Sequence, residues 1–258
     1  MGGLKLKLEG AKVDVNETID INEARVLVSD PVLWPRVRDF LWDFAPQVHE
    51  SWIEGLGPDT LDASKEGNSS ASYALRLMSS PRVKSYVLSA LGITPFFHAF
   101  PKDDWSRLAL LDGSVLREMA KWLGALACAE ALRKVTDGVR VRELKSAFPG
   151  VYPEVFSFTA YFKNPFPHED QDSHDVADNV VKGVMSAGYG VLFSAVSGSP
   201  AQVVERMKLK LPKDSPFVAC VARLSADGRS EAADAKLAER IVGKLLKLKF
   251  PEAYSLCC

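Results

Sequence analysis

The sequence contains little cysteine: four residues among 258, namely Cys128, Cys220, Cys257 and Cys258. No pair has the C-x-x-C spacing of a redox or metal motif, and so few cysteines cannot form the dense disulfide framework of a small secreted protein. Cys128 and Cys220 lie within apolar runs, which predicts that they are small core residues. We therefore expect a reducing compartment, and hence a cytosolic protein.

The sequence also lacks an excess of charge of either sign. Its 32 Lys and Arg residues are matched by 33 Asp and Glu residues, for a formal net charge of −1. No global field therefore attracts nucleic acid or anionic lipid, and partners must be recognised through local patches. Long hydrophobic runs are absent too: no stretch approaches the roughly 18 apolar residues of a membrane-spanning helix. The N-terminal MGGLKLKLEGAKVDV has no apolar core of a signal peptide.

Catalytic motifs are missing as well. The sequence has neither the G-x-S-x-G turn of an α/β-hydrolase nor the G-x-x-x-x-G-K-[ST] phosphate loop. The segment GVMSAGYG (183–190) lacks the G-x-G-x-x-G spacing that holds a pyrophosphate. A Ser-His-Asp triad stays open, because triads are made by geometry rather than by order in the sequence. We expect no cofactor, no metal and no enzymatic activity.

Histidines offer two weak alternatives to this view. His168 and His174 flank acidic residues in HEDQDSH and could bind a cation weakly. Because the segment lies in a proline-bounded linker without helical ligand spacing, we interpret it as a solvated acidic loop. His98 lies among Phe96, Phe97 and Phe100, which is more typical of a packed histidine than of a ligand.

Apolar residues instead recur with the period of an α-helix. Val37, Phe40, Leu41 and Phe44 fall at i, i+3, i+4 and i+7, which predicts one buried helical face before Pro46. The following PQVHESWIEGLG predicts another short helical turn, and residues 57–72 predict a polar loop.

Residues 80–92, SPRVKSYVLSALG, carry both ends of a predicted helix. Ser80 is a suitable N-cap, Pro81 fits the first helical position, and Gly92 lies where a helix ends. The predicted apolar face consists of Val83, Tyr86, Val87 and Leu91. Further helices are predicted over 152–162, 174–198, 199–212 and 230–250, the last ending before Pro251. Because no β-alternation persists, the predicted fold class is all-α: a single irregular helical domain over 30–258, preceded by a loosely structured N-terminal extension over 1–29.

Residues 107–148 have the most regular pattern and predict a central helical hairpin. A long apolar helix is expected first, then a break at Asp137-Gly138, then a shorter helix for which Thr136 or Asp137 is the expected cap. The expected buried face of the first helix consists of Leu116, Met119, Leu123, Leu126, Leu132 and Val135, with Trp122 beside it.

Basic residues surround the break. Arg133, Lys134, Arg140, Arg142 and Lys145 form what we call the basic corner. A basic corner between two rigid helices is suited to receive an acidic partner, and a merely solvated surface is an equal alternative.

The order of these segments resembles the SctK/YscK family, accessory proteins of the sorting platform in bacterial type III secretion systems. The strongest match is the hairpin cadence LG-A-L-x-x-A-x-x-LR-x-x-x-DG-x-x-VR-x-L. The element around Pro46, His49 and Trp52 and the LKLP at Leu209 to Pro212 support it, so that the resemblance covers roughly residues 35–215.

The resemblance implies a cytoplasmic, helical, non-enzymatic adaptor at the cytoplasmic face of the bacterial inner membrane. It would join the cytoplasmic domain of the inner-membrane ring protein (SctD-like) to the pod protein (SctQ-like), and through the pods indirectly to the secretion ATPase complex. Two alternatives come from other classes: a ligand-binding or hydrolytic helical protein using His98 or the HEDQDSH segment, and a peripheral membrane protein using the basic C-terminal helix RIVGKLLKLKF (240–250). For that helix, we favour the interpretation in which its apolar face docks on the core and its lysines remain in water.

Overall fold

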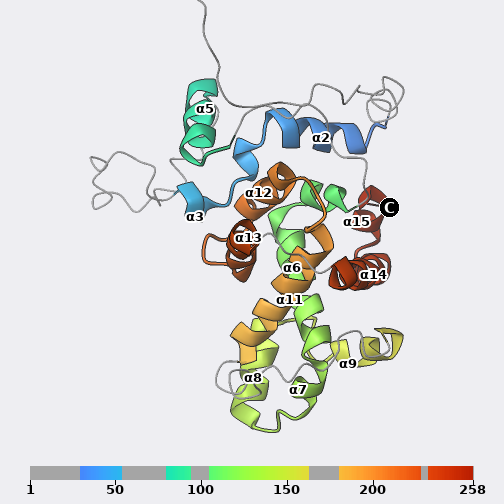
Figure 1. Ribbon diagram of the computed structural model, residues 1–258. Coiled ribbons are helices and arrows are strands. Elements are labelled where there is room, and N and C mark those ends of the chain that lie inside the picture. Colours follow the sequence, from blue (N-terminus) through green and yellow to red (C-terminus); the bar gives the residue numbers. More distant parts are fainter. Residues whose placement is uncertain (1–29, 54–79, 94–104, 163–179, 228–231, 258) are drawn as a thin grey trace, which may run out of the picture.

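The computed structural model describes residues 30–53, 80–93, 105–162, 180–227 and 232–257, and within these ranges every regular element is helical (Figure 1). The predicted all-α class is therefore confirmed. The expected N-terminal extension and the loop at 57–72 lie outside the described residues. The elements are α2 (Leu33–Trp42), η1 (Ala45–Gln47), α3 (Glu50–Ile53), α5 (Pro81–Ala90), η2 (Ser106–Leu110), α6 (Gly113–Ala127), α7 (Ala129–Arg133), α8 (Gly138–Ala147), α9 (Val155–Phe158), η3 (Thr159–Phe162), α11 (Val180–Val196), α12 (Ala201–Leu209), α13 (Pro216–Asp227), α14 (Ala232–Lys249) and α15 (Pro251–Cys257).

Two long helices, α6 and α11, form the centre of the molecule and cross with their backbones in contact. A Cβ atom added at Gly124 would lie 1.9 Å from the carbonyl oxygen of Val184, and one added at Gly188 would lie 1.8 Å from that of Ala120. Only glycine allows such an approach. Because Ala120 faces Gly188 while Gly124 faces Val184, the two helices run antiparallel.

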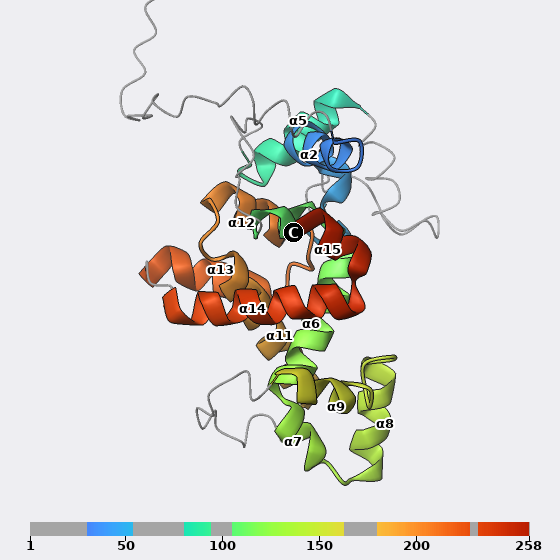
Figure 2. The same cartoon turned by 90° about the vertical axis from the view of Figure 1, so that its right-hand side faces the viewer.

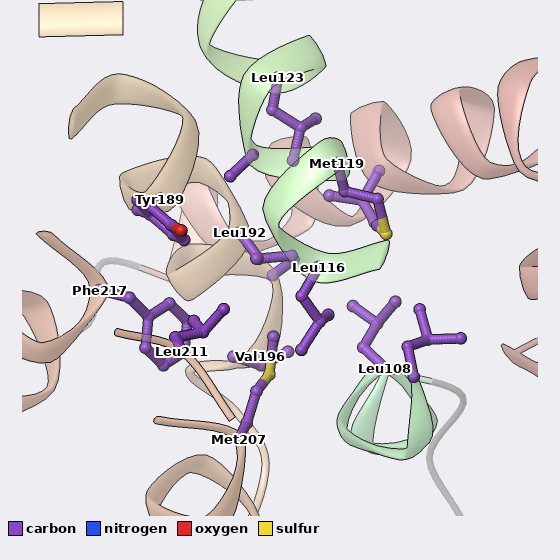
Figure 3. Packing of buried hydrophobic residues seen from close by; sticks show 14 of the residues in the cluster. Leu108, Leu116, Met119, Leu123, Tyr189, Leu192, Val196, Met207, Leu211 and Phe217 are labelled. Atoms are coloured by element: carbon purple, nitrogen blue, oxygen red, sulfur yellow. The ribbon is translucent and has the colours of Figure 1, made fainter. Parts of the chain in front are cut away.

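The core is built around this helix pair. Leu116, Met119 and Leu123 of α6 are fully buried, as are Leu192 and Val196 of α11. Figure 3 shows them packed with buried side chains that come from η2, α12 and the segment that follows α12. Leu126 is also buried, so the predicted burial of Leu123 and Leu126 is confirmed.

The α6–α11 pair connects two groups of helices, as both cartoon views show (Figures 1 and 2). At one end lie α7, α8, α9 and η3, residues 129–162, which we call the distal lobe. The remaining helices, with α2, α5 and α12 at the opposite end, form the body. Within the predicted hairpin, α6 therefore lies at the centre of the molecule, and the part that follows it, α7 and α8, forms one end.

Several local expectations were wrong or incomplete. The long helix expected over residues 107–136 is divided: η2 precedes it, and Cys128, with φ −94° and ψ 12°, separates α6 from α7. Tyr86, expected on a buried face, is 60% exposed, because α5 packs through Val87 instead. Pro251 does end α14, but it also occupies the first position of α15, an additional helix that we did not expect. The apolar run before residue 227 forms α13, also unexpected.

Candidate partner-binding site

The turn between α7 and α8 has the expected geometry. Asp137 is the N-cap of α8, and its side chain accepts a hydrogen bond from the backbone N–H of Val139 at 3.0 Å. This bond satisfies one of the free N–H groups at the helix start. The predicted break at Asp137-Gly138 is confirmed, and Asp137, rather than Thr136, is the cap.

Arg133, although exposed, is held within the distal lobe. Its guanidinium donates a hydrogen bond to Thr159 Oγ1 at 2.7 Å and lies 5.5 Å from the ring centroid of Phe156. Both contacts tie the end of α7 to α9 and η3. Arg133 thus has a structural role whether or not a partner touches it.

The remaining cations of the basic corner are exposed but do not share one face. Arg140 lies 4.0 Å from the carboxylate of Asp137, while Nε of Arg142 donates to the carbonyl of Gly138 at 3.2 Å. Residues two positions apart on a helix are separated by about 200° of rotation about its axis, so Arg140 and Arg142 point to opposite flanks of α8. Lys145, three residues after Arg142, shares its flank. The structure therefore pairs Arg142 with Lys145 and separates both from Arg140.

An apolar residue accompanies these charges at the start of α8. Val139 is 53% exposed, whereas Leu144 on the opposite side of the helix is buried. α8 thus presents an outer surface of Val139 with basic residues on either flank. Its inner surface is fixed to the rest of the molecule by Leu144 and Phe148.

Sequence reasoning missed two buried cations in the body, Arg206 and Lys210. Arg206 is 2% exposed, and its guanidinium donates to the carbonyl oxygens of Phe40 and, at 3.2 Å, of Leu41. These carbonyls belong to the last turn of α2, where no intrahelical partner is available. The guanidinium also lies 5.4 Å from the ring of Phe40. Arg206 therefore fastens the end of α2 to α12.

Lys210 follows one helical turn later and is 3% exposed. Its ammonium donates to the carbonyl of Leu111 at 3.0 Å and lies 5.3 Å from the ring centroid of Phe40. Burial lowers the pKa of Lys210 to about 7, opposed by the carboxylate of Asp112 and assisted by the nearby Arg36. The signal for both cations was present in the sequence, because Arg206 and Lys210 lie among the apolar residues of the segment 203–211.

The two short motifs at Pro46–Trp52 and Leu209–Pro212 meet in space. The backbone N–H of His49 donates to the carbonyl of Leu209 at 2.8 Å, and the indole N–H of Trp52 donates to that of Leu211, also at 2.8 Å. Ser51 Oγ accepts from the backbone N–H of Lys213 at 2.9 Å. Both motifs are thus explained by docking of η1 and α3 onto the end of α12.

The basic C-terminal helix docks on the core as expected. Ile241, Val242, Leu245 and Leu246 of α14 are buried. Lys249, expected in water, instead forms an ion pair with Glu154 at 2.5 Å and lies 4.5 Å from the ring centroids of Trp122 and Phe158. Lys249 ties the distal lobe to the body. No helix within the described residues is long and apolar enough to cross a membrane.

The histidine alternatives fall largely outside the described residues, which exclude His98, His168 and His174. His49 is described, and its ring Nδ1 lies 2.9 Å from Ser51 Oγ. Across the described ranges, no group of three or more His, Cys, Asp or Glu side chains is arranged to hold a metal ion. Cys128 and Cys220, predicted to be small core residues, are both only half-buried, and burial raises the pKa of the Cys128 thiol to about 11.

Comparison with known proteins gives one family. The family model described as YOP proteins translocation protein K (YscK) matches residues 71–257. No curated protein and no solved structure matches the chain. The match extends through α15, well beyond the expected limit near residue 215, and it begins after the Pro46–Trp52 motif rather than at residue 35. Because it covers well over half of the sequence, this chain belongs to the YscK family of type III secretion proteins.

Proposed function

We propose that this protein is a non-enzymatic adaptor of a bacterial type III secretion system. It would act in the cytoplasm at the inner membrane, joining the cytoplasmic domain of an SctD-like ring protein to an SctQ-like pod protein, and through the pods to the secretion ATPase complex. What carries the proposal is membership of the YscK family over residues 71–257. The architecture supports it, because two groups of helices separated by the α6–α11 pair give a protein that holds two partners room for both (Figure 1).

The glycine-packed α6–α11 pair supports a role as a spacer. Backbone contact at Gly124 and Gly188 leaves no side chain at the crossing point of the two helices that could rearrange. Both helices run from the body to the distal lobe (Figure 1). We therefore propose that residues 30–258 act as one domain, so that a partner bound at the distal lobe is held at a fixed separation from one bound at the body.

The distal lobe is our proposed docking surface for one of the two partners, through Arg133, Lys134, Arg140, Arg142 and Lys145. Among these, Arg142 and Lys145 are the most direct candidates, because they share one exposed flank of α8. The Nε–Gly138 bond limits the side-chain freedom that Arg142 would lose on binding. We expect a complementary acidic surface on the partner, which would speed encounter and select the correct orientation.

Charge reversal on the two flanks of α8 tests this assignment. We expect Arg142→Glu/Lys145→Glu to weaken binding to one partner by at least about tenfold, equivalent to about 1.4 kcal/mol. Arg140→Glu, on the opposite flank and with half the change in charge, shows whether the partner contacts that flank as well. The measurement is a titration of each variant with the SctD-like domain and separately with the SctQ-like protein, with circular dichroism to verify folding.

Two outcomes would remove the basic corner from the proposal. Unchanged affinities for both partners in a folded Arg142→Glu/Lys145→Glu variant would make it a solvated surface. Equal weakening of both partners would indicate a general effect of charge rather than a docking site.

A further inference from the structure

The outer face of α14 carries a continuous row of cations. Lys236, Arg240, Lys244 and Lys247 are all exposed and occupy positions i, i+4, i+8 and i+11. With about 100° of rotation per residue, they lie within roughly 80° of the helix circumference and extend over about 16 Å along its axis. We call them the basic row.

The row is directly opposite the apolar face that docks α14 on the core. Ile241, Val242, Leu245 and Leu246 are each 3% exposed or less. Figure 2 shows α14 crossing the near side of the body, with none of the drawn helices in front of it. A docked helix of 18 residues therefore presents its cations on a fixed support.

These four cations have no anionic partner within the described part of the chain: the ion pairs there involve other residues. Lys249, in the last turn of the same helix, does have one, since it pairs with Glu154. Four like charges at helical spacing repel one another and lower the stability of the helix by a few tenths of a kcal/mol for each pair. Binding of an anionic surface would offset the repulsion among these four cations and so recover the stability that the free protein loses.

We propose that the basic row of α14 is a docking surface for a helix of another protein with acidic side chains along one face. Charge complementarity favours this occupant. Acidic residues at the same i, i+4, i+8 and i+11 spacing on a partner helix would align with the row along its length. This surface lies on a different helix from the basic corner, and the inference does not depend on the adaptor function.

A flat anionic membrane fits the row less well than a helix does. The apolar residues of α14 that would enter a bilayer are already used in the core, and only Leu248, 45% exposed, remains at the edge of the row. Glu239, half-buried, lies beside the row on α14, one turn from Lys236. A planar surface would approach this carboxylate as well, whereas a narrow helix can follow the cations and leave the carboxylate in water.

The experiment uses the full chain and two labelled helical peptides of equal composition. The first carries glutamates at i, i+4, i+8 and i+11, and the second distributes the same number around its circumference. Fluorescence anisotropy should show binding of the aligned peptide at low salt, at least about fivefold tighter than binding of the distributed peptide, and weakening as salt rises.

Arg240→Gln/Lys244→Gln should weaken binding of the aligned peptide by about tenfold. The control Arg38→Gln/Arg82→Gln removes the same charge from exposed positions on α2 and α5 and should change the affinity less than twofold. Equal effects of the two variants, or equal binding of the two peptides, would overturn the proposal. So would absence of peptide binding, including the case in which phosphatidylglycerol vesicles bind through the row and the peptide does not.

Discussion

Replacing Lys210 with methionine should make this protein more stable, and the gain should depend on pH. Lys210 is an ammonium in the core, 3% exposed, that faces Phe40 and donates to the carbonyl of Leu111. Arg36, Asp112 and Arg206 are the charged groups nearby. Burial lowers the folded-state pKa of Lys210 from 10.5 to about 7. Methionine keeps the length of the side chain and removes the charge.

The direction of the change in stability with pH follows from the number of protons that each state binds. Below pH 7 the lysine is protonated in both states, so the folded protein bears the full cost of a buried charge. Between pH 7 and 10.5 the folded state releases the proton while the unfolded state keeps it, so the stability of the wild type rises with pH. Each tenfold change in proton affinity is equivalent to about 1.4 kcal/mol. Between pH 6 and 9.5 the wild type should therefore gain about 3 kcal/mol relative to Lys210→Met.

The assay is urea unfolding of both proteins at pH 6 and at pH 9.5. Other titrating groups are common to the two chains and cancel in the difference between them. The loss of the Leu111 hydrogen bond in the variant also cancels to first order, because it applies at both pH values. If the stability difference is the same at pH 6 and pH 9.5, Lys210 keeps an ordinary pKa and our account of its burial is refuted.

Three further changes test the packing. Gly188→Ala should lower the free energy of unfolding by about 2 to 3 kcal/mol, because its Cβ would meet the backbone of Ala120. The control Gly190→Ala, in the same helix, places its Cβ in open space and should be neutral or slightly stabilising. Equal melting temperatures of the two variants would contradict the close crossing of α6 and α11. Leu123→Ala should cost about 2 to 5 kcal/mol in chemical unfolding, and an unchanged midpoint would mean that this face is not buried. Trp52→Phe removes the indole donor to Leu211 and should cost about 1 kcal/mol, with no loss showing that water replaces the bond.

The helical period of apolar residues correctly predicted features that depend only on residues close together in the sequence. The face of α2 through Val37 and Phe40 is buried as expected, and Asp137 caps α8, because the cap and the helix it begins are neighbours in sequence. Tyr86 shows the limit of the method. Its position on α5 is compatible with an apolar face, but burial depends on what packs against that helix, which the sequence does not reveal.

The polar contacts that hold distant segments together could not be predicted. Lys210 and Leu111 are separated by 99 residues, and Trp52 and Leu211 by 159. Nothing in the spacing of a lysine among apolar residues says which carbonyl it will reach. The five cations of the basic corner illustrate the same point at short range. Their closeness in sequence suggested one surface, yet the rotation of α8 places Arg140 and Arg142 on opposite flanks.

If this protein is an adaptor, it joins a ring protein and a pod protein that do not associate without it. The most direct test of this function is size-exclusion chromatography with light scattering on the purified full chain, the cytoplasmic domain of the SctD-like ring protein and the SctQ-like pod protein. We predict one complex that contains all three proteins, and no complex of ring and pod proteins when this chain is left out. Association of the ring and pod proteins without it, or binding of neither, would contradict the adaptor function.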